Sequence, residues 1–298
     1  MPERPSNAAV SVREYLYVDT LRVRTLLAQL SSGLPETRRS DHTRQWTASL
    51  TDLDGPQHDE GTRNQEVRSL ADLHVAMLED DAEYAQMLLD VSEISKKPKN
   101  WNRGRIHRAL NPGSLIRVKG PTSVIYPASF AASVNAFSSV TDDSTFSRDV
   151  EKIVNAMYGE HLTLRVYPCG QDEWDYQFSG VISDPGNYLA GEKTVLFSRL
   201  GADPQEWTTL ATISRIPERD TISPTVRFER VMATLQEAVA DGEVNRQVLE
   251  RMIQETSRAM EGFGFSEAPT WPAISVIPLA VYRSVQASKI TPELQRGD

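Results

Sequence analysis

The hydrophobic pattern near the start of the chain predicts a strand followed by a helix. Residues 12–19, of sequence VREYLYVD, are rich in residues that favour β-structure. Asp19 or Thr20 then supplies an N-cap, because a side-chain oxygen there can accept a hydrogen bond from the first helical turn. Four apolar residues follow on one helical face: Val23, Leu26, Leu27 and Leu30. Gly33 is expected to end this helix, since glycine tolerates the left-handed conformation found there.

A polar stretch and a long helix are expected next. Residues 37–65 contain few apolar residues apart from Trp46. We expect a long mobile loop here, which either extends away from the domain or becomes ordered when a partner binds. Apolar positions over 67–91 predict a helix with one broad apolar face, interrupted around Asp80 and Asp81. Residues 96–100 are expected to end it.

The middle of the sequence predicts a mixture of strands and helices. A pair of short strands at 115–119 and 123–126 is expected to flank a turn at Gly120-Pro121, because these two residues break regular structure. Helices are predicted from Ala128 onward and over 145–158. Alternating or β-branched apolar residues predict strands at 162–166, 174–182, 194–198 and 207–216.

The C-terminal part predicts a helical pair and a last strand. Helices at 224–240 and 243–262 are separated by Asp241-Gly242, a turn signal. A strand is predicted at 273–283. Its Pro278 lacks a backbone donor, which implies an edge position or a bulge.

The order of these elements favours an α+β fold. Strands and helices do not alternate strictly, which argues against a doubly wound parallel sheet. We expect a mixed, largely antiparallel sheet with several helices and a long loop. A single domain is expected over residues 12–285, between a mobile tail at 1–11 and a polar tail at 286–298.

Composition and charge point to a cytoplasmic protein. The 298 residues include 32 Lys and Arg against 41 Asp and Glu, a net charge of −9. No stretch approaches the roughly 20 consecutive apolar residues of a membrane-spanning helix, and the first residues lack the pattern of a signal peptide. Cys169 is the single cysteine and cannot form an intrachain disulfide, as expected in a reducing compartment. We therefore predict no membrane association.

One segment, residues 96–108, is strongly basic and contains no acidic residue. It holds Trp101 and six cations: Lys96, Lys97, Lys99, Arg103, Arg105 and Arg108. Such a run can neutralise phosphates while the aromatic ring stacks on a base. The simpler interpretation is a solvated loop, and it is favoured because an acidic chain with one such run lacks a broad basic face.

Motifs for catalysis, metals and cofactors are missing from the sequence. It has no Gly-x-Ser-x-Gly nucleophile motif and no glycine-rich phosphate-binding motif. His161, Cys169, Asp172 and Asp175 form the only cluster that invites a metal, and their spacing matches no familiar zinc site. The sequence therefore predicts no metal and no cofactor, identifies no catalytic residue, and leans away from an enzyme.

Three segments resemble a bacterial family of domains of unknown function. Residues 14–19, EYLYVD, with RV at 22–23, LLAQL at 26–30 and Gly33, resemble its opening. IPLAVYR at 277–283 resembles its terminal strand, and ISRI at 213–216 resembles a strand before its last helical pair. The resemblance implies a bacterial cytosolic origin and one folded unit, but no mechanism.

The polar residues of the opening and closing segments form a candidate ligand site. If the first and last strands are neighbours, one cleft would gather Tyr15 or Tyr17, Asp19, Arg22, Tyr282 and Arg283. Guanidinium groups bind oxyanions in a bidentate manner, so this set suits a phosphate-bearing or other anionic ligand. The simpler alternative is that Asp19 only caps the helix.

Two functional hypotheses follow. The first is a non-catalytic accessory protein that binds a partner protein or a small anionic ligand, with the loop at 37–65 as its contact element. The alternative is a nucleic-acid- or nucleotide-directed binder or enzyme that uses residues 96–108, whose binding would weaken steeply as salt rises.

Overall fold

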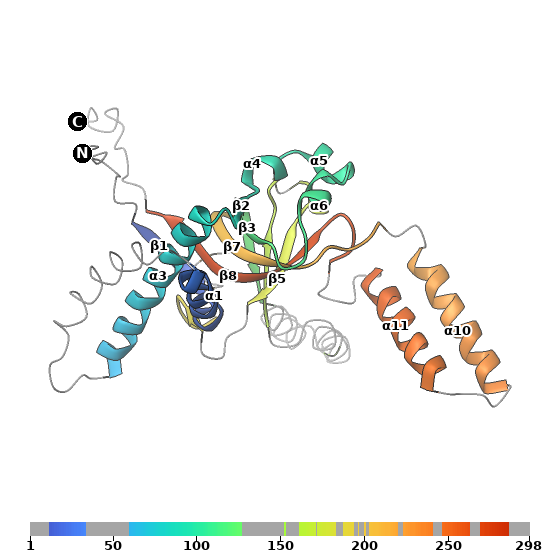
Figure 1. The fold of residues 1–298 in the computed structure, drawn as a ribbon. Helices are drawn as coiled ribbons and strands as arrows, with labels where there is room; N and C mark the ends of the chain where they lie inside the picture. Colours follow the sequence, from blue (N-terminus) through green and yellow to red (C-terminus); the bar gives the residue numbers. More distant parts are fainter. Residues whose placement is uncertain are drawn as a thin grey trace, which may run out of the picture.

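The protein is α+β, as predicted. The computed structural model describes residues 12–33, 60–126, 161–170, 172–182, 187–193, 203–219, 223–240, 246–262 and 269–285, with Lys152, Leu196 and Leu200. This part of the chain contains seven helices and one mixed sheet of eight strands, whose arrangement is shown in Figure 1. The expected tails at 1–11 and 286–298, the helix from Ala128 and all of the helix at 145–158 except Lys152 lie outside the described residues.

The first strand and helix form as the sequence predicts. Strand β1 (Arg13–Val18) leads through Asp19 into helix α1 (Thr20–Gly33). The Asp19 carboxylate oxygen Oδ1 accepts a hydrogen bond of 2.9 Å from the backbone nitrogen of Arg22, which confirms the N-cap. The backbone nitrogen of Asp19 also donates to the carbonyl of Leu279 at 2.8 Å, so the cap is tied to the last strand.

Helix α3 (Glu60–Tyr84) differs from the prediction at both ends and in its middle. It begins inside the expected loop, so residues 60–65 are helical, while residues 37–59 lie outside the described part. The interruption predicted at Asp80 and Asp81 is wrong, because the helix continues through both residues and its buried face packs on the sheet. Of the two aspartates, Asp80 is exposed and Asp81 is buried. That face comprises Ala71, Val75, Leu78, Asp81 and Ala82.

The helix also ends earlier than predicted. Gln86 adopts a left-handed conformation, with φ of 58°, and this breaks the helical hydrogen-bond pattern. Residues beyond it form a short strand, β2 (Leu88–Asp90), which pairs in parallel with β3 (Leu115–Ile125). Residues 67–91 are therefore a helix followed by a strand.

The basic segment contains the second and third of three short helices that follow β2. These are α4 (Ser92–Ser95), α5 (Pro98–Asn102) and α6 (Arg105–Ala109). The expected loop at 96–108 is wrong, because Trp101 and Ile106 are buried in the core and hold α5 and α6 against the barrel, although the six cations are exposed.

The turn predicted at Gly120-Pro121 is also wrong. Both residues lie inside the single long strand β3. They stand where β3 changes its neighbours, because β7 (Gln205–Arg215) pairs with residues 115–122 and β4 (Leu162–Val166) pairs with residues 122–125. A Cβ on Gly120 would lie 3.3 Å from the Cα of Pro168, so the glycine permits a close approach of two backbones.

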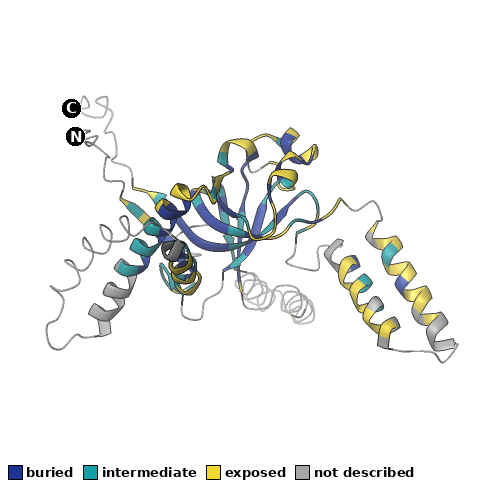
Figure 2. Ribbon diagram, viewed as in Figure 1, coloured by how far each residue is buried: buried dark blue, intermediate teal, exposed yellow. Residues whose placement is uncertain are grey.

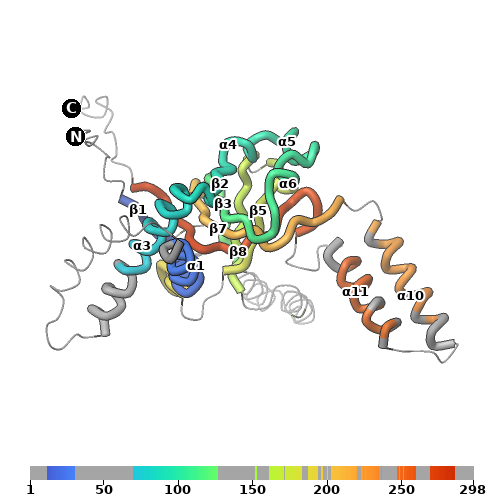
Figure 3. The backbone as a smooth tube through the Cα atoms, viewed as in Figure 1, coloured from blue at the N-terminus to red at the C-terminus, as the bar shows by residue number. Residues whose placement is uncertain are grey.

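Five strands close into a barrel. The order of pairing around the barrel is β3, β4, β5 (Phe178–Ile182), β8 (Ile274–Ser284) and β7. Strand β7 then pairs with β3 and closes the barrel. Strand β8 also pairs with β1, and β1 pairs with β6 (Tyr188–Leu189). Figure 3 shows β1 and β8 side by side, although they come from opposite ends of the sequence.

Strand β8 lies at the centre of the sheet, so the edge position suggested for Pro278 is wrong. Its register with β7 shifts next to Pro278, which confirms the bulge. The strand predicted at 174–182 is confirmed only from Phe178 onward. In the predicted strand at 194–198, Leu196 is the one described residue and it is helical.

The last helical pair, α10 (Pro224–Ala240) and α11 (Arg246–Gly262), forms as predicted. The two helices pack on each other and extend away from the barrel (Figure 1). Most of their described positions are exposed, whereas the barrel strands are largely buried (Figure 2). None of the helices in the described residues is long and apolar enough to cross a membrane.

Candidate functional site

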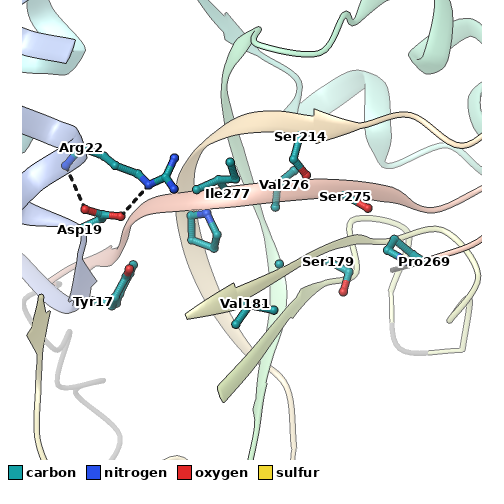
Figure 4. A pocket seen from close by; sticks show the side chains of 12 residues that line it. Tyr17, Asp19, Arg22, Ser179, Val181, Ser214, Pro269, Ser275, Val276 and Ile277 are labelled. Atoms are coloured by element: carbon teal, nitrogen blue, oxygen red, sulfur yellow. Dashed lines mark hydrogen bonds and ion pairs between the residues drawn. The ribbon is translucent and has the colours of Figure 1, made fainter. Parts of the chain in front are cut away.

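A pocket of about 370 Å³ lies where the end of β1 meets the barrel (Figure 4). This volume is within the usual range for small-molecule sites, roughly 300–1,000 Å³. Its wall is formed by the start of α1 and by parts of β5, β7 and β8. The polar side chains that line it are Tyr17, Asp19, Arg22, Ser179, Ser214 and Ser275.

Strands β5 and β8, which both line the pocket, pair over a very short length. The parallel pairing joins only Phe178 to Ile274 and Ser179 to Ser275. Next to it, Gly180 brings β5 very close to β8: a Cβ there would lie 2.5 Å from the carbonyl oxygen of Val276 and 2.9 Å from Pro278 Cδ. The wall of the pocket therefore requires a glycine at position 180.

Substitution of Gly180 by alanine is expected to lower the free energy of unfolding by about 1–3 kcal/mol, because the added methyl group must push two strands apart. Gly120→Ala is the matched comparison. Its nearest contact would be 3.3 Å, so a smaller loss is expected. Urea unfolding of both variants measures the difference, and a Gly180→Ala protein as stable as wild type would contradict the proposed close contact.

Asp19 holds the guanidinium group of Arg22 at the pocket. One Asp19 carboxylate oxygen accepts from the Arg22 backbone nitrogen at 2.9 Å, and the other lies 3.2 Å from Arg22 Nε. The Asp19 side chain is 8% exposed and that of Arg22 is 54% exposed. Among the described residues, neither terminal nitrogen of this guanidinium has a partner, and Figure 4 shows the group reaching from α1 toward Ile277.

The remaining polar groups of the pocket are hydroxyls. The Tyr17 hydroxyl is buried and accepts a hydrogen bond of 3.2 Å from Asn187 Nδ2. Ser179 is buried, and Ser275 Oγ is a buried atom without a hydrogen-bond partner in the described part of the chain. A serine hydroxyl can rotate to donate a hydrogen bond to an anion.

Tyr282 and Arg283 do not line this pocket, although β1 and β8 are neighbours. The Tyr282 hydroxyl donates to Glu79 of α3, and its ring lies 5.4 Å from that of Tyr15. Arg283 binds Glu14 at 2.7 Å and lies over the ring of Trp207. The structure therefore brings Tyr17, Asp19 and Arg22 together and places the other two candidates elsewhere.

The serines were missed by sequence reasoning. They carry no local signal, because the parallel pairing of β5 with β8 joins segments that are far apart in the chain. Only knowledge of that register could have identified Ser179 and Ser275 as neighbours.

The second candidate site is divided between surface and core. All six cations of residues 96–108 are exposed, and Lys96 binds Glu93 at 2.5 Å. Trp101 is fully buried, and its Nε1 donates to the carbonyl of Ser95 at 2.8 Å. Its ring is therefore unable to stack on a base. Binding of phosphate by the cations stays a prediction.

The Cys169 thiol is held in its protonated form. Burial raises the pKa of the Cys169 thiol to about 11, so it stays protonated at neutral pH, and it donates to the carbonyl of Ser95. Over the residues that the structure describes, no group of three or more His, Cys, Asp or Glu side chains is arranged to hold a metal ion.

Comparison with known proteins gives a family and no function. A family model described as "Domain of unknown function (DUF6414)" matches residues 12–282. No curated protein and no solved structure matches the chain. The bacterial and cytosolic origin stays a prediction. Because the match includes every described strand and helix from β1 to most of β8, the chain belongs to the DUF6414 family.

Proposed function

We propose that the protein binds a small anionic ligand, one carrying a phosphate or carboxylate group, in the pocket beside Arg22. The observation that carries the proposal is the arrangement of Asp19 and Arg22. The Asp19 carboxylate accepts a hydrogen bond from the backbone nitrogen of Arg22 and forms an ion pair with its Nε. The two terminal nitrogens of Arg22 have no partner among the described residues. Two such nitrogens form the face of a guanidinium that binds an oxyanion with two hydrogen bonds.

The surroundings favour an anion over a cation. The charge of Asp19 is already opposed by Arg22, and no second acidic side chain from the described residues lines the pocket. The N-terminus of α1 adds a partial positive charge beside Arg22. The serine hydroxyls of β5 and β8 supply further donors. A ligand with one anionic group and a small body suits the volume of about 370 Å³.

Thermal unfolding in the presence of inorganic phosphate, sulfate and adenosine monophosphate tests this function. A probe at 100 times its dissociation constant should stabilise the wild-type protein by about 2.7 kcal/mol. Arg22→Ala should abolish this stabilisation, and Arg22→Lys should weaken it, because an ammonium group lacks the planar pair of donors.

Arg24→Ala is the matched control, since Arg24 is an exposed arginine of the same helix that does not line the pocket. This variant should respond to the probes as the wild type does. Equal stabilisation of the wild type and Arg22→Ala by every probe would refute the proposed site.

Binding of a partner protein stays a prediction. The expected contact element at 37–65 lies outside the described residues except for its last six positions, which are helical. The α10–α11 pair does expose apolar side chains, namely Phe228, Met232, Leu249 and Ile253.

A further inference from the structure

We infer that the surface formed by α5 and α6 binds double-stranded nucleic acid through its phosphate backbone. This basic surface consists of Lys97, Lys99, Arg103, Arg105 and Arg108, with Lys96 at its edge. It is separate from the pocket beside Arg22, because none of its residues lines that pocket.

The helices that carry the cations are anchored to the rest of the fold. Trp101 packs against Phe178 at 5.1 Å between ring centres, and Asn102 Nδ2 donates to the Tyr176 hydroxyl at 2.7 Å. In α6, His107 stacks on Trp271 at 3.8 Å, and its Nε2 lies 2.8 Å from the carbonyl oxygen of Pro272. Figure 2 shows exposed outer positions on these helices over buried inner ones. The backbone that carries the cations is therefore already ordered, and only their side chains lose conformational entropy on binding.

Most of these charges are not neutralised by acidic side chains of the described residues. Residues 96–108 contain no acidic residue. Lys96 binds Glu93, but within the described ranges the other five cations form no ion pair. This is unusual on a chain with a net charge of −9, where acidic partners are plentiful. A surface that keeps five exposed and unpaired cations together attracts a polyanion.

The chemistry of the surface favours nucleic acid over an acidic protein. A protein interface is held by apolar or aromatic anchors at its centre. Within residues 96–108 the aromatic and apolar side chains Trp101 and Ile106 are buried, so the exposed face offers mainly charge and hydrogen-bond donors. Phosphate oxygens need only such donors, and they supply no sequence information.

The same surface favours a duplex over a single strand. Proteins that bind single strands stack bases on exposed aromatic rings. Trp101 is buried, and the exposed Trp174 is flanked by Asp172, Glu173 and Asp175, which repel phosphates. Without a stacking platform, the regular backbone of a duplex is the better match.

Fluorescence anisotropy with labelled 20-base-pair DNA and RNA duplexes, each of mixed sequence, tests the inference from about 50 to 200 mM salt. The wild-type protein should bind a duplex with an affinity that falls steeply as salt rises. The triple variant Arg103→Ala, Arg105→Ala, Arg108→Ala should bind about tenfold or more weakly at low salt. The slope of the logarithm of its binding constant against the logarithm of the salt concentration should be smaller in magnitude by up to about 2.7, because each lost phosphate contact with B-DNA lowers it by about 0.9.

The control variant Arg24→Ala, Lys119→Ala, Arg230→Ala removes three exposed cations from other parts of the chain. It has the same net charge as the test variant, so a difference in duplex affinity between the two variants does not come from net charge. If binding depends on the basic surface, the control variant should bind the duplex within about twofold of wild type. Circular dichroism and thermal unfolding check that both variants fold. Arg22→Ala should still bind the duplex, which separates this inference from the proposed pocket.

Three results would overturn the inference: no duplex binding at low salt, equal loss of binding in both triple variants, or tighter binding of a labelled single strand. Competition with polyglutamate provides a further test. If polyglutamate displaces the duplex as well as unlabelled duplex does at equal charge, the surface recognises acidic polypeptides instead.

Discussion

Replacement of Glu79 by alanine is expected to lower the free energy of unfolding by about 3–5 kcal/mol. The Glu79 side chain is 3% exposed and joins α3 to the sheet. Its carboxylate accepts hydrogen bonds from Arg13 of β1 and from the Tyr282 hydroxyl of β8. It also lies 3.6 Å from Arg117 of β3. Removal of the carboxylate leaves a partly buried guanidinium and a buried hydroxyl without this partner.

Urea unfolding of Glu79→Ala and Glu83→Ala measures this effect against a matched control. Glu83 lies one helical turn further along α3 and binds the same Arg117 at 2.6 Å, but its side chain is 50% exposed. A loss below about 1 kcal/mol is therefore expected for Glu83→Ala. Similar losses for the two variants would show that burial of Glu79 does not determine its contribution.

Replacement of Trp101 by alanine is expected to cost about 3–5 kcal/mol of folding free energy. The ring is fully buried beneath α5 and contacts Tyr176, Phe178 and His107. The substitution leaves a cavity and removes the hydrogen bond from Nε1 to the Ser95 carbonyl. Because Trp101 anchors the basic surface, duplex binding should weaken as well.

Trp174→Ala is the control for this substitution, since Trp174 is 55% exposed. A change within about 0.5 kcal/mol is expected for a surface position of this kind. The stability of Trp101→Phe should fall between the stabilities of Trp101→Ala and Trp174→Ala, because phenylalanine keeps most of the packing but loses the hydrogen bond to Ser95. Equal stability of Trp101→Ala and Trp174→Ala would contradict the anchoring role of Trp101.

The opening of the chain was predictable because its determinants are local. Asp19 both ends β1 and caps α1, and Val23 and Leu27 follow on the buried face of the helix. The same segment supplied Tyr17, Asp19 and Arg22, but their grouping into a candidate site also assumed that the first and last strands are neighbours, a long-range pairing. The helical pair α10–α11 was predictable for the same reason, since helical periodicity and a turn signal suffice.

The errors arise where long-range pairing overrides a local signal. Gly120-Pro121 has the composition of a turn, yet pairing with β7 keeps β3 extended through it. Residues 88–90 continue an apolar helical pattern but become β2, because β3 offers a partner for a parallel strand. In both cases the partner strand is distant in the sequence, and its position cannot be read from the segment itself.

The candidate site was only partly predictable for a related reason. Its arginine and aspartate lie three residues apart, but Ser179 and Ser275 come together through barrel closure. Trp101 illustrates the same difficulty. A helix of five residues is too short for its periodicity to show which side is buried, so the sequence did not distinguish a core residue from a stacking residue.

The most direct test of the anion site is an anomalous difference map from crystals soaked in sodium selenate, an anion whose selenium atom can be located without ambiguity. We expect a peak in the pocket with selenate oxygens at hydrogen-bonding distance, about 3 Å, from the terminal nitrogens of Arg22. The peak should vanish in Arg22→Ala and persist in Arg24→Ala. A map with no selenium in the pocket, or with peaks only at the basic surface of α5 and α6, would contradict the proposed function.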